Sequence, residues 1–128
     1  MPHFIVEYSS NLEERADIAA LCEEIRKVAL TTGVFEAGGV RVRAYPAKHF
    51  AIADAHDRNA FVHLQLRVGA GRSVERLKAA GETVFDALKA FFAAELGEPH
   101  FGLSFEIAEI HSELSWKANS IHPRLRGN

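Results

Sequence analysis

Three residues of this 128-residue chain could together serve a site for a small acid, namely Pro2, Arg41 and Arg72. If Met1 is removed, Pro2 carries a free secondary amine, and a terminal amine ordinarily titrates at about 7.7–8.0. Nearby cations and an apolar pocket lower that pKa, and an amine that is neutral near pH 7 is a competent general base. The alternative is structural, because a strand tolerates proline at its first residue. The chemistry therefore depends on whether Met1 stays attached.

Both arginines follow glycines, in Gly38-Gly39-Val40-Arg41 and Gly69-Ala70-Gly71-Arg72. Glycine allows the backbone to approach an anion closely, and a guanidinium binds a carboxylate through two parallel hydrogen bonds. A single arginine can equally be a surface charge, and the sequence leaves both interpretations open. The second stretch lacks the Lys-Ser/Thr pair and the spacing of a nucleotide-binding loop, so we exclude that function.

Histidine and cysteine patterns point away from metal and disulfide chemistry. His49, His56 and His63 are seven residues apart without the compact ligand spacing of a metal site, so no metal is expected. The single cysteine, Cys22, excludes an internal disulfide and suits a reducing cytoplasm. It falls on an apolar helical stripe, which predicts a buried structural thiol.

Composition is that of an ordinary soluble domain, with 48% hydrophobic and 25% charged residues. The net charge of -2 argues against nucleic acid as the main partner. We see no secretory signal and no apolar run long enough to cross a membrane, so neither a membrane partner nor secretion is expected. The sequence predicts one cytoplasmic domain over residues 1–128.

Hydrophobic periodicity predicts four strands and two helices. Strands are expected over 4–8, 40–45, 61–68 and 103–110, and residues 46–59 are expected to be mostly loop. A capping box at 10–13 is expected to start the first helix, which carries an apolar stripe from Ile18 to Ala29 and stops at Gly33. Ser73 is expected to cap the second helix, which ends before Gly97.

The elements form two β-α-β units in series, with pseudo-repeats at about 2–58 and 59–122. Right-handed crossovers place both helices on one face of a four-stranded sheet, giving an α/β two-layer sandwich. The other face is polar, and it either contacts solvent or faces other subunits of an oligomer. Its predicted members are Arg41, Arg43, His63, Gln65, Arg67 and Glu106.

Five stretches together resemble the 5-carboxymethyl-2-hydroxymuconate isomerase family of the tautomerase superfamily, which also includes 4-oxalocrotonate tautomerase and macrophage migration inhibitory factor. They are Pro2–Glu7, Gly39–Arg43, Ala60–His63, Gly69–Ser73 and Leu103–Ile107. The resemblance extends from residue 2 to about 122 with nearly matching spacing. It implies a tautomerase-like homotrimer whose sheets surround a central channel and whose helices lie outside, so that the polar face points inward.

The resemblance also implies a cofactor-free reaction. Pro2 corresponds to the family's general base, and Arg41 and Arg72 correspond to its catalytic arginines, which hold carboxylates and stabilise oxyanion charge. The implied substrate is a small polycarboxylate dienol, 5-carboxymethyl-2-hydroxymuconate, which becomes its conjugated ketone during homoprotocatechuate (4-hydroxyphenylacetate) degradation. Phe61 is a candidate pocket wall, and Trp116 either lines the pocket or packs at a subunit interface. The stretch His122-Pro123-Arg124 is interpreted as an ordinary polar tail.

Two alternatives remain beside this isomerase. One is a related tautomerase or dehalogenase acting on another unsaturated acid, and substrate profiling would separate it. The other is a non-catalytic trimeric binding protein for anionic metabolites, which would bind dicarboxylates tightly without converting a dienol to a ketone.

Overall fold

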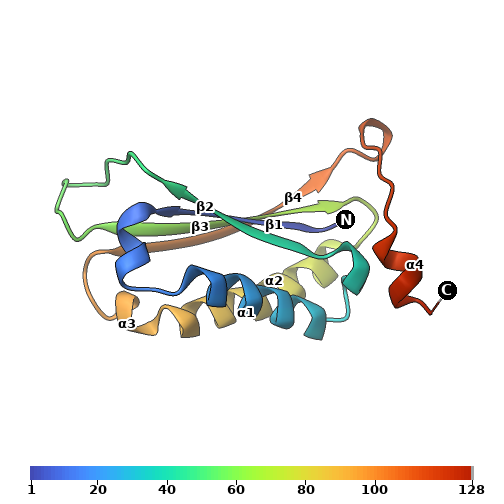
Figure 1. Cartoon of the computed structure of the whole chain (residues 1–128), viewed down its shortest axis with the longest axis horizontal. Coiled ribbons are helices and arrows are strands. Elements are labelled where there is room, and N and C mark those ends of the chain that lie inside the picture. The colour runs from blue at the N-terminus through green and yellow to red at the C-terminus, as the bar shows by residue number, and fades with distance from the viewer. Residues whose placement is uncertain (128) are drawn as a thin grey trace.

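Two helices pack across one face of a four-stranded sheet in the computed structural model, which describes residues 1–127 (Figure 1). The strands are β1 (His3–Ser9), β2 (Arg41–Ala47), β3 (Ala60–Gly69) and β4 (Phe101–Ile110), and the long helices are α1 (Ile18–Thr31) and α2 (Val74–Phe91). The shorter elements are η1 (Ser10–Glu14), η2 (Ala37–Gly39), α3 (Ala93–Leu96), η3 (Ser112–Leu114) and α4 (Ile121–Leu125). The predicted two-layer fold is confirmed.

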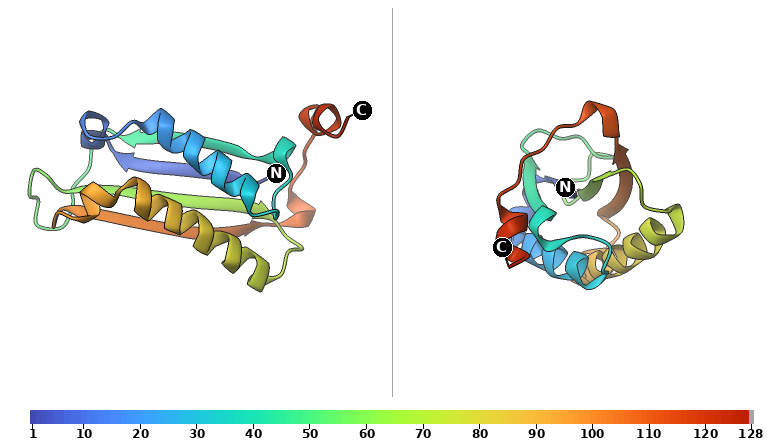
Figure 2. Two further views of the ribbon diagram at one scale, coloured as in Figure 1. Left: turned by 90° about the horizontal axis from the view of Figure 1, so that it is seen from below. Right: turned by 90° about the vertical axis from the view of Figure 1, so that its right-hand side faces the viewer.

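The sheet order is β2-β1-β3-β4, and it joins two similar halves. β1 pairs in parallel with β2, and β3 pairs in parallel with β4, so each half is a β-α-β unit. The antiparallel pair of β1 and β3 joins the halves at the centre of the sheet. Figure 2 shows α1 and α2 side by side beneath this sheet.

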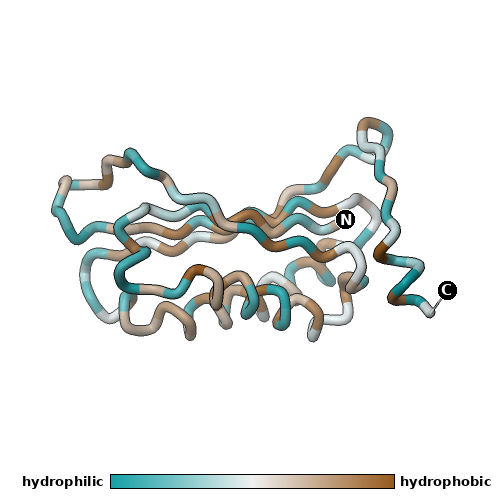
Figure 3. The backbone as a smooth tube through the Cα atoms, in the orientation of Figure 1, coloured by the Kyte–Doolittle hydropathy of each residue, from teal (hydrophilic) through white to brown (hydrophobic). Residues whose placement is uncertain are grey.

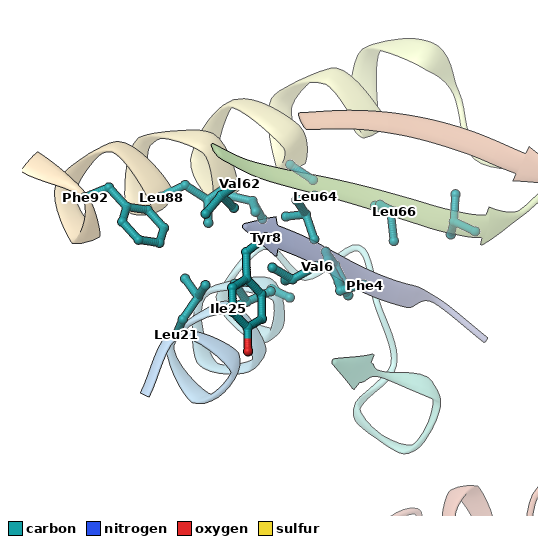
Figure 4. Close-up of a cluster of buried hydrophobic side chains, with 14 of the residues drawn as sticks. Phe4, Val6, Tyr8, Leu21, Ile25, Val62, Leu64, Leu66, Leu88 and Phe92 are labelled. Atoms are coloured by element: carbon teal, nitrogen blue, oxygen red, sulfur yellow. The ribbon is translucent and has the colours of Figure 1, made fainter. Parts of the chain in front are cut away.

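Alternation along the central strands builds the core between the layers. Phe4, Val6 and Tyr8 of β1 point toward the helices, and the strands place them beside alternate residues of β3 (Figure 4). Each fully buried side chain of this size contributes roughly 1.5–3 kcal/mol by leaving water. The buried partners from β3 and the helices are Val62, Leu64, Leu66, Leu21, Ile25, Leu77, Val84 and Leu88.

The start of the first helix differs from the sequence expectation. The predicted capping box at 10–13 is wrong, because residues 10–14 form the 3-10 turn η1 and α1 begins only at Ile18. Glu13 is occupied elsewhere, since its carboxylate accepts a hydrogen bond of 2.8 Å from the Tyr8 hydroxyl. Asp17 caps the helix instead, accepting from the backbone N–H of Ala20 at 3.0 Å. At the second helix, the Ser73 cap is confirmed by a 3.2 Å bond from the backbone N–H of Arg76.

Cys22 also departs from its prediction. It lies beside the apolar stripe of α1 but is half-buried rather than buried, and this burial raises the pKa of its thiol. The stripe itself is confirmed, because Leu21, Ile25 and Ala29 are buried.

The face of the sheet away from the helices is polar and is linked by side-chain hydrogen bonds. Arg43 Nη1 lies 3.0 Å from His3 Nδ1, and His63 Nδ1 lies 2.6 Å from the Ser104 hydroxyl oxygen. Gln65 Nε2 donates to the Glu106 carboxylate at 3.2 Å. These contacts link β1 to β2 and β3 to β4. Brown and teal alternate along the strands in Figure 3, as expected for a sheet with one apolar face. Within residues 1–127, no helix is both long and apolar enough to cross a bilayer.

Candidate active site

Pro2 lies buried at the start of β1, where the neighbouring strand fixes its position. Its carbonyl oxygen accepts a 3.1 Å hydrogen bond from the backbone N–H of Arg41, the first residue of β2. Gly39 packs against the pyrrolidine ring, because a Cβ added there would lie only 3.1 Å from Pro2 Cδ. The ring is therefore held between its strand and the glycine pair before β2.

A hollow of about 220 Å³ opens beside the first residues of the chain, and we call it the N-terminal pocket. It brings together Pro2 and Arg72, which are far apart in the sequence, so two of the three predicted catalytic residues line one space. The full lining is Met1, Pro2, Glu36, Gly39, Arg72, Lys117 and His122. A larger hollow of about 610 Å³ lies between α2 and β4 and contains none of the predicted site residues, so its size does not make it the better candidate.

Arg72 is held at the pocket by contacts that leave donors free. Its Nε donates to the Val34 carbonyl and its Nη1 to the Gly69 carbonyl, each at 3.2 Å. The guanidinium carbon lies 5.7 Å from the centre of the Phe35 ring, a further favourable contact. Arg72 forms none of the ion pairs found within residues 1–127. Since a guanidinium has five N–H donors, several remain for a carboxylate.

Arg41 stands next to the pocket rather than in its lining. Its Nη1 donates to the Gly38 carbonyl at 3.0 Å, and its side chain is half-buried. The positive charge of Arg41 nevertheless affects the amino group at the start of the chain. Burial, followed by the positive charges of Lys117, Arg72 and Arg41, lowers the pKa of the Met1 amino group. A terminal amine in this place is therefore more often neutral than an ordinary one.

Phe61 was predicted as a candidate pocket wall, and Trp116 was predicted either to line the pocket or to pack at a subunit interface. Neither residue is in the lining of the N-terminal pocket of a single chain. β1 and β3 are antiparallel, with Tyr8 opposite Val62, so Phe61 lies at the far end of the sheet from Pro2. Trp116 is 86% exposed and directly precedes Lys117 of the pocket. Both remain predictions, and Phe61 could serve the pocket only from another copy of the chain.

Comparison of the sequence with known proteins shows the family of this chain. The profile of 5-carboxymethyl-2-hydroxymuconate isomerase matches residues 2–125. The Escherichia coli 5-carboxymethyl-2-hydroxymuconate Delta-isomerase is 41% identical over 122 residues, which is 95% of this chain and 97% of that protein. The chain belongs to the 5-carboxymethyl-2-hydroxymuconate isomerase family.

Solved structures of this isomerase family and of its wider superfamily have the same fold. The crystal structure of a 5-carboxymethyl-2-hydroxymuconate isomerase from Deinococcus radiodurans R1 is 42% identical, with a TM-score of 0.90, covering 98% of this chain and 94% of that one. A fused 4-OT symmetric trimer is only 12% identical, with a TM-score of 0.67 over 91% of this chain and 93% of that one. That distant likeness shows the shared tautomerase fold, as the sequence predicted.

The last segment of the chain belongs to the pocket of this isomerase, which the sequence interpretation missed. His122 was assigned to a polar tail, yet it lines the pocket, and its Nδ1 contacts the Glu36 carboxylate. Arg126 donates to the same carboxylate through Nε at 3.2 Å, and this hydrogen bond is the main cause of the lowered pKa of Glu36. Asn119 Nδ2 donates to the Gly38 carbonyl at 2.9 Å. These contacts fasten α4 beside η2, near the start of the chain (Figure 1).

Gly38, in the glycine pair before β2, is the residue in the sequence that allows α4 to pack here. A Cβ at Gly38 would lie 2.6 Å from His122 Nδ1 and 2.9 Å from His122 Cα, so the tail fits only because that side chain is absent. Replacing Gly38 with alanine is expected to displace α4 and to cost about 1–3 kcal/mol of stability, as overpacking usually does. Limited proteolysis should then cut the segment after β4 faster, and the melting temperature should fall.

The matched control for this prediction is Gly102→Ala, because a Cβ at Gly102 would meet open space. That variant should keep both the melting temperature and the cleavage rate of the wild type. If Gly38→Ala behaved like Gly102→Ala, then the docking of α4 on the glycine pair would be wrong.

Proposed function

We propose that this chain converts 5-carboxymethyl-2-hydroxymuconate to its conjugated keto isomer, with the Pro2 nitrogen as the proton carrier. The neutral amine takes the proton of the 2-hydroxyl group, and the electron pair left on oxygen forms the C2 carbonyl. The double bonds shift along the chain of the substrate, and the protonated amine returns a proton to C5. Substrate and product are isomers, so no electron, water molecule or co-reactant is consumed.

The observation that carries this proposal is the N-terminal pocket, which combines a base and a cation at one point. Pro2 and Arg72 line the same space, and burial and nearby cations lower the pKa of the Met1 amino group at the chain start. Once Met1 is removed, the Pro2 nitrogen is the terminal amine among the same cations. A base that is neutral near pH 7 can accept a proton there without a metal or an organic cofactor.

The two arginines supply the charge that the reaction needs. Arg72 has free donors that face the pocket, and we assign it to the oxygen on which negative charge develops and to a neighbouring carboxylate. Arg41, anchored on the Gly38 carbonyl beside the pocket, holds a second carboxylate. Donors that are already oriented lower the barrier because they need not reorganise as the charge forms.

A homotrimer completes the proposed site. The polar sheet face and the 86% exposed Trp116 support burial against neighbouring copies, and the fused 4-OT relative is itself a symmetric trimer. In that assembly Trp116 packs at an interface, and Phe61 of one copy walls the pocket of another. The single cysteine suits a reducing compartment such as the cytoplasm.

The direct test is to follow the dienol and the ketone spectroscopically after mixing the purified protein with 5-carboxymethyl-2-hydroxymuconate. We expect saturable conversion without added metal, with one deuterium entering C5 when the reaction runs in D2O. Faster turnover of another unsaturated acid, such as a 3-chloroacrylate, would instead favour the tautomerase or dehalogenase alternative. Tight binding of dicarboxylates without any ketone formation would favour the binding protein and contradict the proposal.

A further inference from the structure

Lys117 stands where two hollows meet. It lines the N-terminal pocket and also an adjoining hollow of about 140 Å³, and Met1 is the other residue shared by the two linings. The remaining walls of this second hollow, which we call the side pocket, come from the ends of β3 and β4 and the turn after β4. They are Gly69, Ala70, Ile110, Ser112 and Ser115. Because Met1 borders both spaces, its removal would widen the passage between them.

The position of Lys117 is set by the anchored segment that follows it. Two residues later, Asn119 Nδ2 donates to the Gly38 carbonyl at 2.9 Å, while its Oδ1 accepts from the backbone N–H groups of Ile121 and His122. The segment around Lys117 therefore runs beside the chain start, as Figure 1 shows for the stretch between β4 and α4. Lys117 takes part in none of the ion pairs formed within residues 1–127, so its ammonium group is available to a ligand.

Lys117 is the third cation around the chain start, beside Arg41 and Arg72. The one carboxylate in the lining of the N-terminal pocket, Glu36, is already held by Arg126 and contacted by His122, so it does not cancel these charges. The proposed substrate carries three carboxylates, two on the muconate chain and one on the carboxymethyl branch. The three cations around the chain start, with Arg72 and Lys117 in the lining and Arg41 beside it, match the three carboxylates in number. The side pocket offers a separate space for the carboxymethyl branch.

We propose that Lys117 binds the carboxymethyl carboxylate of the substrate, with the branch entering the side pocket. Lys117 is then the residue that distinguishes a branched tricarboxylate from an unbranched dicarboxylate with the same dienol. This inference rests on the proposed function, since it assigns one substrate group to one side chain of the same site. A charge-assisted hydrogen bond of this kind corresponds to roughly a 10- to 100-fold preference.

The test compares Lys117→Gln with the wild type on two substrates, 5-carboxymethyl-2-hydroxymuconate and 2-hydroxymuconate, which lacks the branch. Both are measured on the high-pH plateau, so that any change in the pKa of the amine affects neither rate. We expect kcat/KM for the branched substrate to fall about 10- to 100-fold, mainly through KM, and to change less than about threefold for 2-hydroxymuconate. Lys117→Arg should retain most of the preference. The exposed Lys27 of α1 supplies the control, and Lys27→Gln should match the wild type.

Equal losses on both substrates, or no loss on either, would overturn the assignment of Lys117. Failure of the proposed function gives a different result, because the wild type would then convert neither dienol. In that event calorimetry with two unreactive acids judges Lys117 by itself. If the wild type binds tricarballylate more tightly than glutarate and Lys117→Gln abolishes the difference, the third-carboxylate site stands, and an unchanged difference refutes it.

Discussion

Replacing Pro2 with alanine is expected to lower kcat for ketone formation by at least about 100-fold and to leave the fold intact. The pyrrolidine ring is buried against Gly39, and the Pro2 carbonyl is bonded to the first N–H of β2, so the nitrogen has one orientation. A primary amine on alanine lacks the ring and can rotate away from the substrate. Misplacing a reacting group by about 1 Å can cost on the order of 100-fold in rate. The measurement is kcat on the high-pH plateau.

Pro99→Ala is the matched control for this substitution, because Pro99 is exposed in the turn before β4. Its kcat should equal that of the wild type. Circular dichroism and the melting temperature should show that both variants are folded. A folded Pro2→Ala protein with an unchanged kcat would remove the proline nitrogen from the mechanism.

Replacing Arg72 with alanine is expected to reduce kcat by about 100- to 1,000-fold, which is the usual loss when one donor to a developing oxyanion is removed. It should also change the pH profile. Arg72 is among the cations that lower the pKa of the Met1 amino group, and we expect it to act in the same way on the Pro2 nitrogen once Met1 is removed, so its loss should raise that pKa. Because the base must be neutral, kcat/KM rises with pH and levels off above the pKa. The midpoint of the variant should therefore lie at a higher pH than the midpoint of the wild type.

Arg76→Ala tests whether this effect belongs to Arg72 itself. Arg76 is an exposed arginine of α2 whose side chain does not line the N-terminal pocket. Its removal should leave both kcat and the midpoint of the pH profile unchanged. A normal kcat in Arg72→Ala, or a midpoint that moves to lower pH, would contradict the role of Arg72 as a cation at the base.

Local sequence patterns predicted the layers of this fold because each pattern reports directly on burial. Residues 61–68 alternate in hydrophobicity, and they form the strand whose alternate side chains are buried. Ser73 caps its helix as predicted, since its side chain accepts from the backbone N–H of Arg76. The pattern at 10–13 failed because the Glu13 carboxylate accepts from the hydroxyl of Tyr8, a residue that lies outside the four-residue motif.

The residues of the candidate site were predicted from their types, but that they form one catalytic site was implied by the family resemblance. Pro2, Arg41 and Arg72 were proposed from their residue types and glycine neighbours, and the structure brings Pro2 and Arg72 into one pocket with Arg41 beside it. The contribution of His122 could not be read from its own neighbours. It follows from a contact between residues more than 80 positions apart, and Gly38 gives only an indirect signal of it.

The mechanism depends above all on Pro2 carrying the terminal amine. The most direct test is the intact mass of a catalytically active preparation. We expect active protein to be lighter than the translated chain by one methionine residue, because only then can the Pro2 nitrogen accept a proton. Full activity in a preparation whose every molecule retains Met1 would contradict the mechanism, since that nitrogen would then be a non-basic amide.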